Sequence, residues 1–320
     1  MASLLVLREK IKEFLGVNDA YIRPLFKFVV VFVALMILDS VTGYMEILGY
    51  PAVMLVLALA CAFLPANCIL LILMAYLLGQ VYAVSMIAMV VLFVILLVMY
   101  LLYYHFTPKD SFILILTPVC FALHMPYLVP LLVGIFLTPF SIVSAAFGTF
   151  LYYALVFFNE NGSALVATDE DAVSEVLAIL LDGLINNQIM YAVIVVFAAT
   201  IAIVYLVRIL PMKYSYPYAL VTGTIVQMVG FILMRLMVNY ELSIGMLIGM
   251  SLLSLLIAGL TAFVVIPLDY SRTEVVRYED DDYYYYVRAV PKYTVTKPNV
   301  KVKRINARKE RRASSGRKRS

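Results

Sequence analysis

The chain has 320 residues, of which 64% are hydrophobic and 14% are charged, and its formal net charge is +4. A soluble domain is nearer to half apolar and a quarter charged, whereas the mean hydropathy here is +0.99. This composition excludes an ordinary soluble domain. Since apolar runs of about 18 or more residues recur, it predicts an all-α, polytopic transmembrane helical bundle whose main partner is the lipid bilayer.

The chain begins with a predicted cytoplasmic segment, residues 1–22, which carries basic residues in a short amphipathic pattern without a small-residue cleavage site. The transmembrane domain is expected over residues 23–270. Its first span is predicted at 25–46, with Asp39 roughly 18 Å deep at 1.5 Å per residue. Glu46 is expected near the far end of the same span.

Residues 50–82 form two apolar pieces separated at Leu64-Pro65-Ala66-Asn67. Each piece is shorter than the roughly 20 residues that a perpendicular spanning helix needs. Asn67 is expected to cap the second piece, because its side chain can accept from a free helical N–H. A full span then follows at 84–104.

A second broken region follows, with short apolar pieces at 111–126 and 128–138 and a span at 139–158. Proline removes a backbone donor and interrupts a helix. The predicted helix breaks are Pro65, Pro118, Pro126, Pro130 and Pro139. The order short piece, break, short piece, long span thus occurs at 50–104 and at 111–158, as in internal transporter repeats. If every piece spans, there are about ten spans; otherwise there are about six spans and two re-entrant hairpins.

The loop 159–187 is acidic and lacks Lys and Arg, so it is expected outside, with an amphipathic helix over 169–185. Further spans are predicted at 188–210, 216–238 and 243–267. In the last, Gly245 and Gly249 form a GxxxG pair that permits close helix contact, expected within the chain, with dimerisation as the alternative. Lys and Arg gather at both termini and in two loops, which predicts both termini in the cytoplasm.

Ionisable and amide side chains inside the membrane segments are the candidates for a substrate or ion pathway, because such groups are costly in lipid. They are Asp39, Glu46, Asn67, Gln80, His124, Gln227 and Arg235. Glu46 and Arg235 are expected at the most similar depth in the membrane, so they are the best candidates for an ion pair. The alternative is structural: ion pairing, snorkelling or hydrogen bonding between helices. Neither a catalytic nor a metal-binding motif is present, so the chain is expected to be no enzyme and to use no cofactor.

The cytoplasmic tail begins as a Tyr-rich extended segment, residues 271–305, with strand-like alternation over 283–305. Residues 306–320 are basic and expected to be disordered. Basic charge beside a bilayer attracts anionic lipid, which is a more probable partner for this tail than nucleic acid.

The tail pattern EDDDYYYYVRAVPKYTVTKP, together with the multi-pass body, resembles uncharacterised multi-pass integral membrane proteins of anaerobic Firmicutes that carry a permease-like label. That resemblance implies a bacterial cytoplasmic membrane location. The stretch VPLLVGIFLTPFSIVSAAFG is similar to the Pro/Gly-containing stretches of vitamin-uptake membrane components. An ABC-type role would need separate ATPase subunits or other membrane subunits.

Two functions follow as hypotheses. The first is the membrane component of a transport system for a small solute, with the interrupted helices forming its site. The second is a non-transporting membrane scaffold that recruits cytoplasmic partners for envelope or secretion processes through its tail. A polar cavity at the proline-broken region favours transport, whereas a packed apolar interior beneath a structured tail favours the scaffold.

Overall fold

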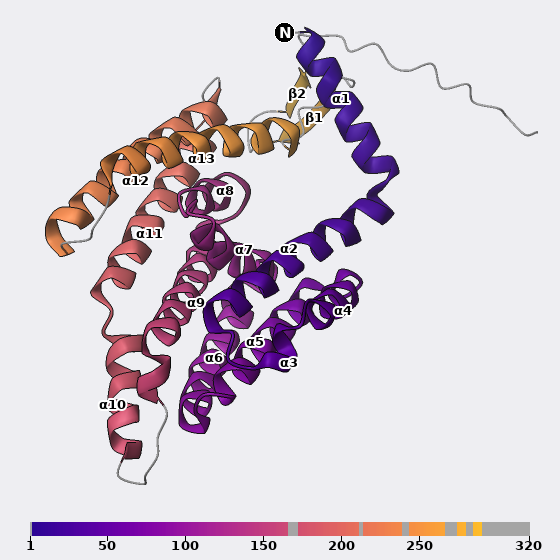
Figure 1. The fold of residues 1–320 in the computed structure, drawn as a ribbon. Coiled ribbons are helices and arrows are strands. Elements are labelled where there is room, and N and C mark those ends of the chain that lie inside the picture. Colours follow the sequence, from indigo (N-terminus) through magenta and orange to yellow (C-terminus); the bar gives the residue numbers. More distant parts are fainter. Residues whose placement is uncertain are drawn as a thin grey trace, which may run out of the picture. The chain divides into compact units, whose positions relative to one another are not determined.

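A computed structural model of the chain describes residues 2–165, 172–210, 214–238, 243–265, 274–279 and 284–289. The chain divides into two units (Figure 1). One contains Met1–Lys10 and Pro267–Ser320, and the other contains Ile11–Ile266. The second unit, called the membrane unit below, holds all the candidate pathway residues.

The described α-helices are labelled in Figure 1; the first, α1, is divided between the two units, and the others belong to the membrane unit. In chain order the helices are α1 (Ala2–Val17), α2 (Asp19–Thr42), α3 (Glu46–Gly49), α4 (Pro51–Ala62), α5 (Ala66–Tyr82), α6 (Met86–Phe106), α7 (Ser111–Ala122), α8 (Leu128–Phe136), η1 (Pro139–Ser141), α9 (Ile142–Asn161), η2 (Gly162–Leu165), α10 (Ala172–Ile185), α11 (Gln188–Ile209), α12 (Ser215–Val238) and α13 (Ile244–Val265).

Among the described residues, six segments are long and apolar enough to cross a membrane: α2, α6, η1 with α9, most of α10 with α11, α12 and α13. Their outward faces are apolar as well. On α6, for example, Val94, Leu97 and Leu101 are 52%, 47% and 59% exposed. Soluble monomers seldom expose such continuous apolar surface, whereas lipid accepts it. The predicted all-α transmembrane bundle is confirmed.

Both predicted broken helix pairs are present. In the first pair the 12-residue α4 is separated from the 17-residue α5 by a turn at Pro65, which has an extended backbone. In the second pair the 12-residue α7 is separated from the 9-residue α8 by a turn that contains Pro126. The helices of each pair are short because a proline, Pro65 or Pro126, lies in the turn between them, and proline has no N–H with which to continue a helix.

The five predicted helix breaks do not behave alike. Pro65 and Pro126 lie between helices, and Pro139 begins the short helix η1. Pro118 lies inside α7, which continues to Ala122, so Pro118 does not end a helix as a predicted break would. Pro130 is the third residue of α8, where a backbone N–H would have no intrahelical partner in any case; it therefore permits the helix to start and does not break it.

The first span is also placed differently from the prediction of 25–46. Helix α2 runs from Asp19 to Thr42, and Gly43 follows with a φ of 20° while its N–H bonds to the Asp39 carbonyl at 2.7 Å. Only glycine adopts such a backbone at little cost. Glu46 therefore begins the separate helix α3 and is not part of the first span.

Two groups of helices form the apolar core. Helices α2, α4, α5, α6 and α10 share one buried cluster. Helices α8, α11, α12 and α13 share two others, and α7 and α9 belong to both groups. Glycines permit the closest approaches: a Cβ on Gly148 of α9 would lie 2.5 Å from the Thr117 Cβ of α7.

Helix α13 packs through a different face from the one predicted. A Cβ on Gly245 or Gly249 would meet no atom within 4 Å among the described residues. The prediction that this GxxxG pair packs within the chain is therefore wrong for the part that the structure describes. The buried residues of α13 are instead Leu247, Ser251, Ser254, Ala258 and Ala262.

In the other unit, the tail contains a two-stranded antiparallel sheet formed by β1 (Glu274–Glu279) and β2 (Tyr284–Ala289). The register pairs Val276 with Val287 and Tyr278 with Tyr285. The strand predicted over 283–305 is confirmed for β2, but its partner β1 was not predicted. The expectations for residues 290–305 and 306–320 fall outside the described residues.

Candidate functional site

Helices α4 and α5 form a hairpin that extends along α2. At its tip, Lys27 Nζ of α2 donates to the Leu64 carbonyl in the α4–α5 turn at 2.9 Å. At its open side, Met45 N just after α2 donates to Gln80 Oε1 of α5 at 2.8 Å. We call the first of these two levels of the membrane unit the Lys27 end. We call the second the Tyr44 end, after the residue that precedes Met45. The α4–α5 hairpin opens at the Tyr44 end and reaches the Lys27 end.

Helices α7 and α8 form a hairpin with the opposite direction. Ser111, the first residue of α7, donates to Asn67 Oδ1 at the tip of the first hairpin, which places it at the Lys27 end. The segment that follows α8 returns there, because Ser141 Oγ donates to Asp110 Oδ2 at 2.5 Å. This hairpin therefore opens at the Lys27 end, and its turn points toward the Tyr44 end.

The helices of the second hairpin are shorter than the hydrocarbon core of a bilayer is thick. Helices α7 and α8, of 12 and 9 residues, are roughly 18 and 14 Å long at 1.5 Å per residue, against about 30 Å for the hydrocarbon core. Its turn ends against the remaining helices through aromatic contacts. Phe121 stacks on Tyr152 of α9 at 4.6 Å, and Tyr127 meets Phe231 of α12 edge-on at 5.0 Å.

Each hairpin is followed by a long helix, so the repeated hydropathy order corresponds to a repeated order of helices. Helix α6 runs from the Tyr44 end to the Lys27 end, where Tyr103 Oη donates to the Pro108 carbonyl beyond it. Helix α9 runs the other way and ends where Tyr44 Oη donates to the Phe158 carbonyl. The two three-helix sets, α4–α5–α6 and α7–α8–α9, therefore begin at opposite ends of the membrane unit.

Asp39, the deepest predicted carboxylate, lies in a small polar cluster near the Tyr44 end. Its Oδ1 accepts from Gln80 Nε2 at 3.1 Å and from Tyr76 Oη at 3.3 Å. Tyr76 Oη also lies 3.2 Å from the Leu48 carbonyl. A Cβ on Gly49 would be only 3.1 Å from Asp39 Oδ1, so glycine leaves space for the carboxylate. Asp39 and Gln80 were predicted separately as pathway candidates, and the structure brings them together.

Asp39 has only uncharged side-chain partners among the described residues, Tyr76 and Gln80. It lies in the last turn of α2, inside a predicted membrane span. An ionisable residue in such a position is by default a candidate for a functional site.

Glu46 and Arg235 do not form the predicted pair. Glu46 is exposed in α3, and Arg235 is exposed near the end of α12. The ion pair found among the described residues is Arg23–Asp19, one helical turn apart and exposed at the start of α2. The pairing was inferred from height alone, and Glu46 lies outside the first span from which its height was counted.

Asn67 has a structural position at the Lys27 end. Pro65, not Asn67, precedes α5 as its N-cap, and no side chain caps that helix, so the predicted capping role is wrong. Asn67 Oδ1 instead accepts from Ser111 Oγ and from Tyr103 Oη, the latter at 3.2 Å. These bonds fasten the tip of the first hairpin to the base of the second.

His124 closes helix α7. Its N–H bonds to the Phe121 carbonyl at 2.9 Å, and the Met125 N–H bonds to the Cys120 carbonyl at 2.8 Å. This pair of bonds is the Schellman motif, which needs a left-handed residue at the position where glycine is usual. His124 occupies it with a φ of 59° and an exposed side chain. Its described role is therefore to end the helix before Pro126.

Gln227 lies in a completely buried position on α12, away from the Asp39 cluster. Its Oε1 and Nε2 have no hydrogen-bond partner among the described residues. Ser251 Oγ and Ser254 Oγ on α13 share this property. Each buried group without a partner costs roughly 1–3 kcal/mol, so the arrangement calls for an explanation.

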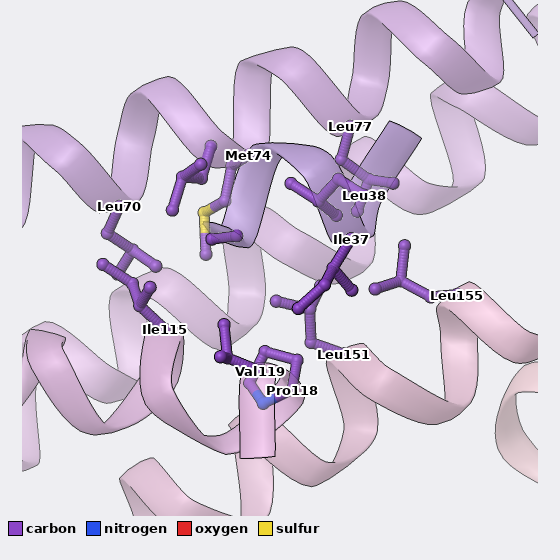
Figure 2. A pocket seen from close by; sticks show the side chains of 12 residues that line it. Ile37, Leu38, Leu70, Met74, Leu77, Ile115, Pro118, Val119, Leu151 and Leu155 are labelled. Carbon is purple, nitrogen blue, oxygen red and sulfur yellow. The ribbon is translucent and has the colours of Figure 1, made fainter. Parts of the chain in front are cut away.

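The proline-broken region itself encloses an apolar cavity of about 30 Å³. Figure 2 shows that its side chains come from α2, α5, α7 and α9 and point toward one another, with Pro118 and Val119 on one side and Leu38 and Leu77 on another. Every lining residue is apolar, and Asp39, Asn67 and His124 are not among them. The polar cavity expected for transport is therefore not found at this position.

Several polar residues of these clusters were missed from the sequence: Tyr76, Tyr103, Ser111, Ser251 and Ser254. One signal was present, because Tyr76 and Gln80 are four residues apart and so share a helix face. Nothing local marks Tyr103 or Ser111, since their partners lie on other helices.

Comparisons of the chain with protein-family models, with curated proteins and with solved structures find no match. Its six apolar spans and lipid-compatible faces define the chain as a multi-pass membrane protein.

Proposed function

We propose that the chain is the permease-like membrane component of a transport system for a small solute. The observation that carries this proposal is the pair of broken-helix hairpins that open at opposite ends of the membrane unit. Interrupted helices in two inverted structural units are the architecture from which many secondary transporters build their sites. Rocking of one unit against the other then provides a route for alternating access.

Asp39 is the ionisable group that couples this movement to a proton or a cation. Its described side-chain partners, Tyr76 and Gln80, carry no formal charge, which leaves the carboxylate available to an incoming cation. Gln80 joins Asp39 to the backbone of Met45, which follows α2. A change of charge on Asp39 therefore acts directly on the link between α2 and α5.

The orientation proposed for the chain places the Lys27 end in the cytoplasm of a bacterial cell. Lys27, Lys109 and Arg208 lie in or beside that end, as basic residues do on the cytoplasmic side. Arg208, at the end of α11, donates to the Ile135 carbonyl of α8 there. Separate ATPase or membrane subunits, and anionic lipid at the basic tail, are the partners that this role allows.

The proposal is tested with the full chain in liposomes, together with any subunit that co-purifies from native membrane. Entry of radiolabelled sugars, amino acids and polyols is measured with and without a pH or Na⁺ gradient. We expect gradient-dependent entry of at least one class, and a loss of more than about tenfold in Asp39→Asn, equivalent to about 1.4 kcal/mol.

Glu46→Gln is the matched control, because it removes a carboxylate at the same end whose side chain is exposed. It should retain gradient-driven entry. Equal entry in Asp39→Asn and the original chain would remove Asp39 from the pathway, and an absence of protein-dependent entry for every solute would refute the transport proposal.

The second candidate, a membrane scaffold, is favoured by the apolar cavity at the proline-broken region and by the β1–β2 hairpin of the tail. A scaffold needs a rigid interior and a structured recruiting segment. Purification from native membrane distinguishes the two roles, since division or secretion proteins retained through the tail would favour the scaffold. Deleting residues 271–320 should release them.

A further inference from the structure

A polar layer interrupts the apolar contact between α12 and α13. On one side, Phe231 and Met234 of α12 share a cluster with Leu247 of α13. On the other side, Ala219 and Leu220 of α12 share a cluster with Ala258 and Ala262 of α13. Helices α12 and α13 are neighbours, so the residues that lie between these two clusters along each helix are at about the same level.

Three polar residues occupy that level: Gln227 of α12 and Ser251 and Ser254 of α13. All three are 0% exposed. Helical serine usually bonds to the carbonyl four residues earlier, as Thr224 nearby bonds to Leu220 at 2.8 Å. Neither of these serines makes such a bond, and neither bonds to Gln227. The layer is thus not the hydrogen-bonded link between helices that the sequence suggested.

We propose that this layer is a binding site for a small uncharged polar solute that carries both donors and acceptors, such as a polyol or an amide. The Gln227 amide supplies a carbonyl acceptor and an N–H₂ donor, and the two hydroxyls supply either. No ionisable side chain is among these three residues, so a charged solute has no counter-charge within the set. The inference deepens the proposed transport function and rests on it, because the solute bound here is taken to be the one that is transported.

Solute entry requires α13 to move away from α12, because the polar atoms of the layer are completely covered. Helix α13 is suited to that movement. It buries the smallest share of its span of the six candidates, 22%. Its contact stripe is also formed mainly by serine and alanine, which offer little side-chain area for packing.

The test measures whether water and solute reach the layer. Cysteine replaces Ser251 or Ser254 in the full chain after Cys61, Cys68 and Cys120 have been changed to alanine. The proteins are placed in liposomes and treated with 2-hydroxyethyl methanethiosulfonate, a small uncharged thiol reagent. Ala258→Cys is the matched control, because it lies on the same buried stripe but within an apolar cluster.

We expect Ser251→Cys and Ser254→Cys to react and Ala258→Cys to react far more slowly. Glycerol or urea at about ten times its Kd should slow the two reactions by about tenfold, whereas glycine at the same concentration should not. Adding Gln227→Leu should abolish that protection. Two serine positions are used so that one poorly folded variant does not decide the outcome.

Equal rates at all three positions would overturn the inference, and so would reaction that glycerol and urea leave unchanged or that glycine slows equally. These outcomes are separate from failure of the transport proposal. If the solute protects the cysteines but does not enter liposomes, the binding site is supported and the transport proposal is refuted. If the solute enters without protecting the cysteines, transport is supported and this binding site is refuted.

Discussion

Replacing Gln80 with leucine tests whether the Asp39 cluster holds α2 against α5. Gln80 is completely buried and bonds both to Asp39 Oδ1 and to the Met45 N–H. Leucine has a similar volume, so the change removes hydrogen bonds without leaving a large cavity. It leaves the Met45 donor unpaired and removes one donor from the carboxylate.

The expected loss follows from those two bonds. An unpaired buried donor costs roughly 1–3 kcal/mol, and a hydrogen bond to a charged group contributes about 1.5–3 kcal/mol. Added burial of the leucine offsets part of this loss. We therefore expect the free energy of unfolding to fall by about 2–4 kcal/mol, which is roughly a 30- to 900-fold change in the unfolding equilibrium.

Unfolding is measured by titration with sodium dodecyl sulfate in mixed micelles. Gln188→Leu is the control, because Gln188 is exposed at the start of α11, and a surface change of this kind should stay within about 0.5 kcal/mol. A double-mutant cycle with Asp39→Asn should give a coupling energy of about 0.5–3 kcal/mol. A loss in Gln80→Leu no larger than that of the control would refute the assigned role of the cluster.

Two further changes test local features by the same unfolding titration. Gly148→Ala should destabilise the chain, because the new Cβ would lie 2.5 Å from Thr117 Cβ, whereas Gly249→Ala meets no atom within 4 Å and should stabilise it by up to about 1 kcal/mol through helix propensity. A similar effect of both alanines would contradict the described packing of α9 and α13. His124→Gly should stabilise the chain by about 1 kcal/mol because glycine removes the left-handed strain, and His124→Val should destabilise it by more; loss of stability in the glycine variant would show that the imidazole makes a necessary contact.

The sequence by itself determined that lipid surrounds the long helices, where most of these helices lie, and two of the places where helices end. Long apolar runs identify lipid-facing helices because hydrocarbon offers no partner to a polar group, and Pro65 and Pro126 separate helices because proline lacks an N–H. The same reasoning failed at Pro118, because the cost of a proline inside a helix is decided by the surrounding packing. It also failed at Gly43, whose backbone conformation is visible only in the fold.

Only the tertiary structure decided which polar groups meet. Asp39 and Gln80 are 41 residues apart, and Ser111 and Asn67 are 44 residues apart, so no local pattern pairs them. Hydropathy records how deep a residue lies but not the direction in which its side chain points around the helix. That direction separates the partnered Asn67 from the buried, unpartnered Gln227. It is fixed when the helices pack, because each helix rotates to bury its own small or apolar face.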